Sequence, residues 1–236
     1  MTQTPSRVMA LTPELVALCH RVVEDQGPVP GAVPMGDGDF APAAADILSR
    51  KPAGPLQLFA YGSLIWKPEV PHVRMRRARA DGWHRAFSME IRRFRATVDQ
   101  PGYMMCLDRG GVCEGVVLQL PEAEPQQQIE KLLRRELSRK VALEAVRWIT
   151  VETAEGPLTA LAFYAGPAAL DNYKPGLSAR DIAPILARAC GHWGSGADYL
   201  YNTVRHLEDQ GIHDKGLWDL QEAVAQEIRK LYRVSD

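Results

Sequence analysis

The sequence predicts an α+β fold in which a mixed β-sheet curls toward a barrel, with flanking helices and a helical C-terminal region. Two observations support this prediction. Short apolar and β-branched runs bounded by turn residues fill the middle of the chain, whereas the last third carries apolar residues at helical spacing. Because strands and helices are segregated along the chain, an α+β layout is favoured over alternating α/β units.

The N-terminal residues predict a helix followed by an arm rich in proline and glycine. Pro13 follows a capping threonine and precedes an acid, which is a good helix start, and apolar residues continue the helix to about Asp25. The arm that follows has at most a short helix, at 43–48. We therefore expect an extension over residues 1–55 and a main domain over residues 56–236.

Six runs in the middle of the chain have the composition of strands: 73–79, 83–90, 103–108, 112–120, 146–153 and 158–164. Between the third and the fourth run, Gly110 and Gly111 follow an Asp-Arg pair, a pattern that predicts a hairpin turn. A helix is expected over 122–140, and it separates the fourth run from the fifth.

Three helices are expected in the last third of the chain. The first begins near Asp181 and tolerates Pro184 in its first turn. The second is capped by Ser195, with Asp198 in a capping-box position, and it stops at Gly211. The third carries an apolar face made by Leu217, Leu220, Val224, Ile228 and Leu231.

Composition and charge argue against several classes of protein. The 236 residues carry a formal net charge of −1, which disfavours a general nucleic-acid binder or a protein of membrane surfaces. No run of about 18 apolar residues is present, so no membrane-spanning helix is expected. The N-terminal residues lack a secretory leader pattern, and the four cysteines are scattered without a CxxC spacing. We therefore expect a cytoplasmic protein with free thiols.

The segment LQLFAYGSLIWK, residues 56–67, predicts a buried strand that breaks at Gly62 and Ser63. Large apolar residues follow at once, so the turn is expected inside the protein. Buried N–H groups without a strand partner need an acceptor, and a bound anionic or carbonyl ligand would supply one. An ordinary tight turn at a strand end is the alternative.

The helix expected over 122–140 places an acid, Glu136, on its apolar face. The stripe consists of Ile129, Leu132, Leu133 and Leu137. A carboxylate there costs free energy unless it is paired or lines a cavity, and desolvation raises its pKa toward the range of proton transfer at neutral pH. The neighbouring Arg134, Arg135 and Arg139 are expected to point to the other side of the helix or to its flank. A structural ion pair is the alternative, with Arg77, Arg85 or Arg93.

Five blocks of the chain match one family in the same order. They are YGSLIWKP at 61–68, GWHRxF at 82–87, LDxGGxCxGV at 107–116, LxRE at 133–136 and YLxNTVxHLxDxGI at 199–212. With these blocks the chain resembles the ChaC-like, glutathione-specific γ-glutamylcyclotransferases. The match runs through most of the chain, and the opening helix resembles the bacterial branch.

The resemblance implies a small curled mixed sheet, with the turn at the mouth of a pocket and a catalytic glutamate facing it. Glu136 would be the catalytic acid and base, and Tyr173 would line the pocket. The γ-glutamyl head would be bound by Tyr61, Gly62, Ser63 and Leu64. Glutathione would be cleaved to 5-oxoproline and Cys-Gly without a metal or an organic cofactor.

One departure from the family bears on the substrate. Many relatives have a short Gly-Ala-Tyr turn after the helix that carries the glutamate, whereas this chain has a longer segment without tyrosine at 138–144. Two rivals follow from this segment and the long arm: a non-catalytic protein that binds γ-glutamyl groups or a partner, and a cyclotransferase for other γ-glutamyl compounds. Oligomeric state is left open.

Other chemistries find weaker support. Ser63 lacks the G-x-S-x-G context of a hydrolase nucleophile, and the six histidines show no HExxH motif or close pair, so no metal site is expected. Cys113 is expected to be a small core residue. The arginine clusters at 74–79 and 92–95 are interpreted as solvated strand edges balanced by acids, with a nucleic-acid patch as the alternative.

Overall fold

The computed structural model describes residues 8–31, 33–137, 139–164 and 172–234. Within these ranges five strands close into a barrel in the order β1-β3-β2-β4-β5. They are β1 (Gln57–Ala60), β2 (Arg74–Ile91), β3 (Gly102–Gln119), β4 (Val146–Thr153) and β5 (Gly156–Phe163). Neighbouring strands are antiparallel except β1 and β5, which are parallel. The predicted curled mixed sheet is therefore confirmed.

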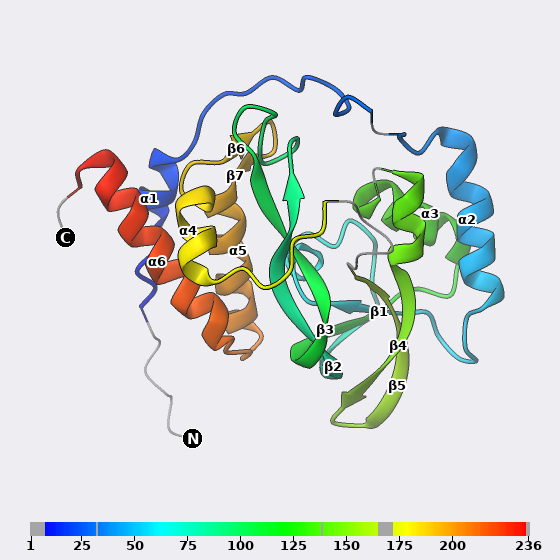
Figure 1. The fold of residues 1–236 in the computed structure, drawn as a ribbon. Helices are drawn as coiled ribbons and strands as arrows, with labels where there is room; N and C mark the ends of the chain where they lie inside the picture. Colours follow the sequence, from blue (N-terminus) through cyan, green and yellow to red (C-terminus); the bar gives the residue numbers. More distant parts are fainter. Residues whose placement is uncertain (1–7, 32, 138, 165–171, 235–236) are drawn as a thin grey trace.

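Helices cover two sides of the barrel (Figure 1). On one side lie α1 (Pro13–Leu18), α4 (Ala179–Leu186), α5 (Gly196–Asp209) and α6 (Lys215–Tyr232), with the short strands β6 (Cys190–Gly191) and β7 (Gly194–Ser195). On the other side lie α2 (Asp37–Ser49) and α3 (Pro125–Glu136). Two 3-10 turns, η1 (Ser63–Ile65) and η2 (Lys140–Ala145), flank the barrel strands.

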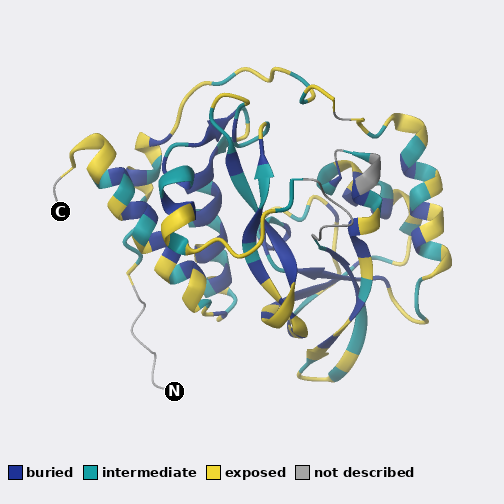
Figure 2. Cartoon of the chain, in the orientation of Figure 1, coloured by how far each residue is buried: buried dark blue, intermediate teal, exposed yellow. Residues whose placement is uncertain are grey.

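The barrel interior and the helix interfaces form two separate apolar cores. Every strand contributes to the interior, through residues that include Phe59, Leu107, Val117, Ile149 and Ala160. The larger core joins the outer face of the barrel to the helices. Figure 2 shows buried stretches, in dark blue, along the barrel strands and along the helices packed against them. A residue such as Leu58 belongs to this second core, because successive strand residues point to opposite faces.

The strand assignment needs one correction. The runs 73–79 and 83–90 form one strand, β2, and the runs 103–108 and 112–120 form one strand, β3. The glycines at 110 and 111 do not make a hairpin turn: the two strands stay paired there, with a register shift between Asp81 and Trp83. Gly110 and Gly111 have positive φ values of 96° and 72°, which suit a bulge that bends the ribbon.

Helix boundaries also differ from the prediction. Helix α1 ends at Leu18 rather than near Asp25, and Val22 is 95% exposed, so no apolar face continues beyond the first turns. Helix α2 begins at Asp37, well before the short helix expected at 43–48, because the Asp39 carboxylate accepts the Gly36 N–H at 2.8 Å and fixes an earlier start. Helix α3 spans Pro125–Glu136, shorter than 122–140.

The predicted Ser195 cap is confirmed, whereas Pro184, expected in the first turn of its helix, lies beyond the first turn because α4 begins at Ala179. Ser178 caps α4 and Ser195 caps α5, where the Ser195 side chain accepts the Asp198 N–H at 3.0 Å. The α5 helix ends before Gly211, whose φ is 68°. Asp198 does not complete a capping box, since its carboxylate pairs with Arg95 at 2.7 Å instead.

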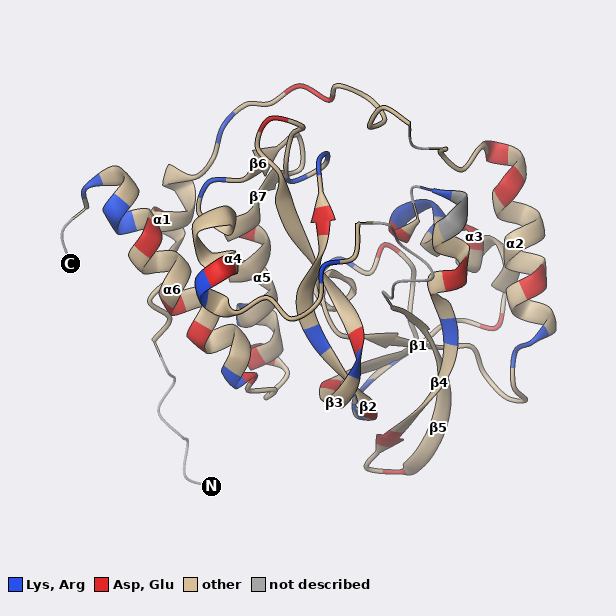
Figure 3. Ribbon diagram, viewed as in Figure 1, with Lys and Arg blue, Asp and Glu red and all other residues tan. Residues whose placement is uncertain are grey.

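The arginine clusters are balanced by acids, as expected. Figure 3 shows both Lys or Arg and Asp or Glu residues on the strands of the barrel. The pairs are Arg74 and Arg76 with Glu155, Arg77 with Glu114, Arg79 with Asp81, Arg92 with Glu90, Arg93 with Asp25 and Arg95 with Asp198. Cys113 is 1% exposed in the barrel interior, which confirms its role in the core.

The N-terminal region is packed against the domain at both ends. In α1 and just before it, Leu11 and Leu15 are buried in the larger core, and the Leu11 N–H donates to the Gln221 side chain at 2.8 Å. In α2, Phe40 lies under the guanidinium of Arg134, 4.2 Å from the ring centroid. The division at residue 55 stays a prediction. None of the described helices combines the length and apolar character needed to span a bilayer.

Candidate active site

One cavity of about 1140 Å³ contains most of the predicted site residues. Its walls come from the η1 turn, the end of α3, the upper halves of β2 and β3, and the arm that crosses the molecule between α1 and α2 (Figure 1). Tyr61, Gly62, Ser63, Leu64 and Glu136 all line it. The structure therefore brings together residues that are separated by more than seventy positions in the chain.

The η1 turn contains backbone N–H groups that can donate to a ligand. Its later amides are satisfied internally: Ile65 N–H donates to Gly62 O at 3.0 Å and Lys67 N–H to Ser63 O at 2.8 Å. The N–H groups of Gly62, Ser63 and Leu64 have no recorded acceptor among the described residues. Such adjacent, unpaired amides are suited to an anionic or carbonyl oxygen.

Side chains on both sides of the turn hold it in place. The Tyr61 hydroxyl donates to Phe163 O of β5 at 2.9 Å, and burial raises its pKa well above the ordinary value, so the phenol stays protonated as a donor. Leu64 is 5% exposed and anchors the turn in the larger core. A Cβ at Gly62 would lie 3.1 Å from the Tyr199 hydroxyl, which is tighter than ordinary contact, so Tyr199 would have to shift to admit a side chain.

Glu136 ends helix α3 with its carboxylate in the cavity. The side chain is 23% exposed. Burial raises the pKa of Glu136, the charge of Arg135 and its hydrogen bond oppose that shift, and the negative charge of Glu69 adds to it. The net direction is upward, toward the range in which a carboxylate accepts and returns protons near neutral pH.

Arg135, expected on the other side of the helix or on its flank, contacts Glu136 directly. Although adjacent residues of a helix point about 100° apart, the long side chain curls back, and Arg135 Nε donates to Glu136 Oε1 at 2.7 Å. Its Nη2 donates to Ser63 Oγ at 3.1 Å, and Nη1 lies 3.2 Å from Glu69 Oε1. Arg135 thus joins the acid to the turn.

The ion pairs considered for Glu136 in the sequence are not formed. Arg77 lies beside Glu114, Arg85 beside Asp214 and Arg93 beside Asp25. These arginines belong to β2 or the loop after it, and each finds an acid on the strand or segment next to it. Local periodicity indicated that Glu136 needed a partner, but it did not indicate which one.

Two cavity residues were missed by sequence reasoning. Tyr199 of α5 is 3% exposed, and burial is the main cause that raises its pKa. Its hydroxyl interacts with Ser63. Cys106 of β3 also lines the cavity, and burial raises the pKa of its thiol, so the thiol is a poor nucleophile. Tyr199 opens the 199–212 block quoted above, which was the available signal.

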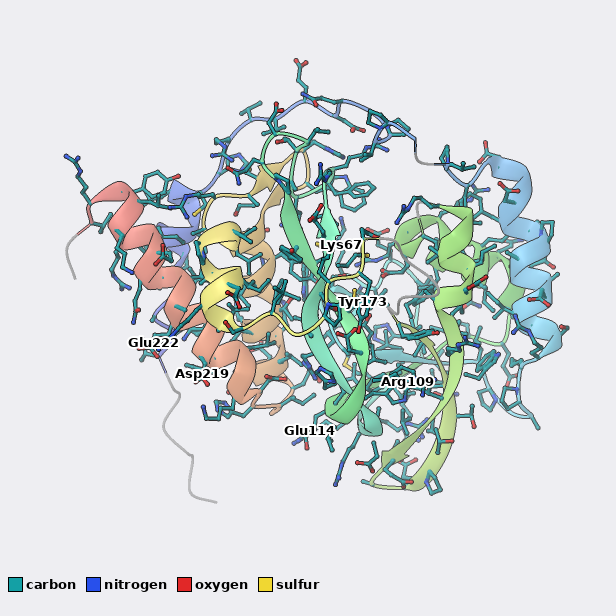
Figure 4. All side chains as sticks on the ribbon, in the orientation of Figure 1. Lys67, Arg109, Glu114, Tyr173, Asp219 and Glu222 are labelled. Atoms are coloured by element: carbon teal, nitrogen blue, oxygen red, sulfur yellow. The ribbon has the colours of Figure 1, made fainter. Side chains whose placement is uncertain are left out.

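Tyr173 is the predicted site residue that does not line the cavity. Asn172 and Lys174 form backbone hydrogen bonds with β2, at 3.0 and 2.7 Å, and both line the cavity. In an extended segment the residue between them points the other way. Tyr173 therefore faces the buried Asp108. Burial raises the pKa of the Tyr173 phenol, and the charge of the Asp108 carboxylate and its hydrogen bond raise it further. Figure 4 shows Tyr173 on the segment that crosses the β2–β3 ribbon.

The arm forms part of the cavity wall. Val29, Pro30 and Pro34 line the cavity, and Pro34 forms a backbone bridge with Arg139. Two hydrogen bonds from Arg93, at 2.7 and 2.6 Å, hold Asp25 at the start of the arm and keep the pKa of Asp25 at about 2. The described residues contain no group of three or more His, Cys, Asp or Glu placed to bind a metal ion.

Solved structures with the same fold include one titled as a γ-glutamyl cyclotransferase specific to glutathione from yeast. It matches with a TM-score of 0.65 over 73% of this chain and 96% of that chain, at 19% sequence identity. A likeness at this identity supports the fold alone.

Sequence comparisons give the family. The family model described as ChaC-like protein matches residues 56–227. The glutathione-specific γ-glutamylcyclotransferase of Escherichia coli (strain K12) is 34% identical over 76% of this chain and 77% of its own length. The γ-glutamylcyclotransferase 2-3 of Arabidopsis thaliana is 30% identical over 71% of this chain and 87% of its own length. The chain therefore belongs to the ChaC-like, glutathione-specific γ-glutamylcyclotransferase family.

Proposed function

We propose that this protein cleaves glutathione to 5-oxoproline and Cys-Gly, with Glu136 as the base and then the acid. The reaction is intramolecular: the α-amine of the γ-glutamyl group attacks its own γ-carbonyl and closes a five-membered lactam. The E. coli relative, at 34% identity, supports the substrate through its name. The assignment of residues rests on the geometry of the cavity.

One observation carries the mechanism. Glu136, with its raised pKa, shares a cavity with the η1 turn, and Arg135 connects the two through contacts of 2.7 and 3.1 Å. A base placed beside a group of N–H donors is the arrangement that acyl transfer requires.

One carboxylate is sufficient for the proton transfers of this reaction. The α-ammonium is unreactive until it loses a proton, and ionised Glu136 accepts that proton. The neutral amine then forms the new C–N bond, and the γ-carbonyl oxygen becomes an oxyanion. When the C–N bond to cysteine breaks, the proton returns from Glu136 to the leaving nitrogen. After the new bond forms, the attacking nitrogen carries one proton more than the lactam needs, and Glu136 accepts this second proton as well. Glu136 passes both protons in turn to the leaving nitrogen, which departs as an ammonium, so no net proton is consumed.

The turn and the shape of the cavity would supply the remaining catalysis. The free N–H groups of Gly62, Ser63 and Leu64 would donate to the oxyanion, where charge develops only as the reaction proceeds. Because the nucleophile and the electrophile belong to one molecule, the protein supplies no covalent nucleophile, and folding the glutamyl chain into the attacking shape is an orientation effect. This chemistry requires no metal or organic cofactor.

The test is a coupled assay in which purified protein is incubated with glutathione and both Cys-Gly and 5-oxoproline are measured. Equal amounts of the two products are expected. Competition with γ-glutamyl amines and γ-glutamyl amino acids then measures how strongly the cavity prefers glutathione. Binding of glutathione without product would favour a non-catalytic γ-glutamyl binder and would overturn the proposal.

A further inference from the structure

Arg135 has donors that its present contacts do not use. Its guanidinium side chain is 11% exposed and lines the cavity. An arginine has five N–H donors. Three of them serve Glu136, Ser63 and Glu69, at 2.7, 3.1 and 3.2 Å. Among the described residues no further acceptor is recorded for it, so one N–H on each terminal nitrogen remains for a ligand.

The pairing of Arg135 with Glu136 is complementary to the head group of an α-amino acid. Such a head group carries an ammonium and a carboxylate on one carbon, and this site presents a carboxylate and a guanidinium on adjacent residues, 2.7 Å apart. When the ammonium of the substrate reaches Glu136, its α-carboxylate is brought beside Arg135. Planar guanidinium groups recognise carboxylates through two parallel hydrogen bonds.

Other arginines of the cavity wall are less suited to this task because their partners lie away from Glu136 and the η1 turn. Their partners are Glu90 for Arg92, Asp25 for Arg93, Asp198 for Arg95, Asp37 for Arg134 and Asn172 for Arg139. Arg135 is the arginine that contacts both the acid and the turn. Its position, rather than its charge alone, distinguishes it.

We propose that Arg135 binds the α-carboxylate of the substrate and selects compounds with an intact α-amino acid head group. This assignment rests on the proposed cyclisation and extends it. The turn amides could bind either the α-carboxylate or the oxyanion of the substrate. If Arg135 binds the α-carboxylate, the turn amides remain for the oxyanion. Glu69 holds the guanidinium from the other side, at 3.2 Å.

The test uses γ-aminobutyryl-cysteinyl-glycine, which equals glutathione with hydrogen in place of the α-carboxylate and cyclises to 2-pyrrolidinone. Wild-type kcat/KM is expected to be about 10- to 100-fold lower on this analogue, the usual range for a lost hydrogen bond to a charged group. Arg135→Met should lose a similar factor on glutathione, mainly through KM, and should no longer distinguish the two compounds. Arg135→Lys keeps the charge and should keep part of the preference.

Several controls separate the possible failures. Arg74→Met removes an exposed arginine that pairs with Glu155 and lies outside the cavity, and it should leave the preference unchanged. A wild-type protein that treats both compounds alike would overturn the role of Arg135 without any variant. So would an Arg135→Met protein that loses activity on both compounds equally and keeps the wild-type ratio, because Arg135 would then act only through Glu136.

Failure of the cyclisation itself would look different, since wild-type protein would release no lactam from either compound. Circular dichroism establishes whether Arg135→Met is folded. If it is not, the wild-type ratio and the Arg135→Lys ratio decide the question. A lysine variant whose ratio exceeds that of wild type would contradict the assignment, because lysine offers no planar pair of donors.

Discussion

Replacing Glu136 with glutamine tests the base while leaving the cavity intact. Glutamine has nearly the same volume and keeps an oxygen that can accept the Arg135 Nε–H at the present 2.7 Å. The amide cannot accept a proton from the substrate. Since a positioned general acid–base contributes about 10²–10⁴-fold, we expect kcat to fall by that factor, which corresponds to about 3–5 kcal/mol of transition-state stabilisation.

The pH profile gives a second readout of the same substitution. Burial raises the pKa of Glu136 above its ordinary value of 4.5, and the base must be ionised to work. Wild-type kcat/KM is therefore expected to rise with pH through that raised pKa, and this acidic limb should disappear in Glu136→Gln. KM for glutathione should change only a few-fold, because the residues proposed to bind the head group are retained.

Glu136→Gln should lower activity but should not lower the stability of the folded protein at neutral pH. The raised pKa means that the folded protein binds this proton more tightly than the unfolded chain does, so wild-type protein loses stability relative to the variant as pH rises from 4.5 through the folded-state pKa. At neutral pH the Tm of Glu136→Gln should equal or exceed that of wild type. Near wild-type turnover in a folded variant would refute the reasoning.

Three further substitutions address the turn and the scaffold. Ser63→Ala should keep activity within about tenfold of wild type, because it removes one hydroxyl acceptor of about 1 kcal/mol and leaves the backbone amides; a loss as large as that of Glu136→Gln would indicate a serine nucleophile. Gly115→Ala should lower the free energy of unfolding by about 1–3 kcal/mol or more, because the new Cβ would lie 2.5 Å from Ala60 O. An unchanged denaturation midpoint would show that the barrel wall shifts to admit the methyl group. Asp214→Asn should cost about 3 kcal/mol in urea titrations, the low end for a buried pair, because the Arg85 side chain is 2% exposed and Asp214 27% exposed; a variant as stable as wild type would contradict this.

The local sequence pattern predicted several elements of the fold and two parts of the candidate site. The strand runs, the Ser195 cap and the acid within an apolar stripe all follow from residues close together in the chain, because caps and periodicities depend on near neighbours. The buried turn at Gly62 and the position of Glu136 were identified in this way. Both line the same cavity.

Tertiary structure decided what local pattern leaves open. Gly110 and Gly111 suit a hairpin turn and a bulge equally well, and only the pairing of β3 with β2 selected the bulge. Tyr173 was assigned to the cavity, but the direction of a side chain in an extended segment depends on which neighbour it pairs with.

The contacts of Arg135 illustrate the same limit most clearly. Its helical position placed it on the flank, yet its side chain is long enough to reach Glu136, Ser63 and Glu69 from there. Two of those three partners belong to another part of the chain, more than sixty residues away. Helical periodicity predicts which face a Cβ lies on, whereas the partners of a long charged side chain depend on which distant segments fold against that face.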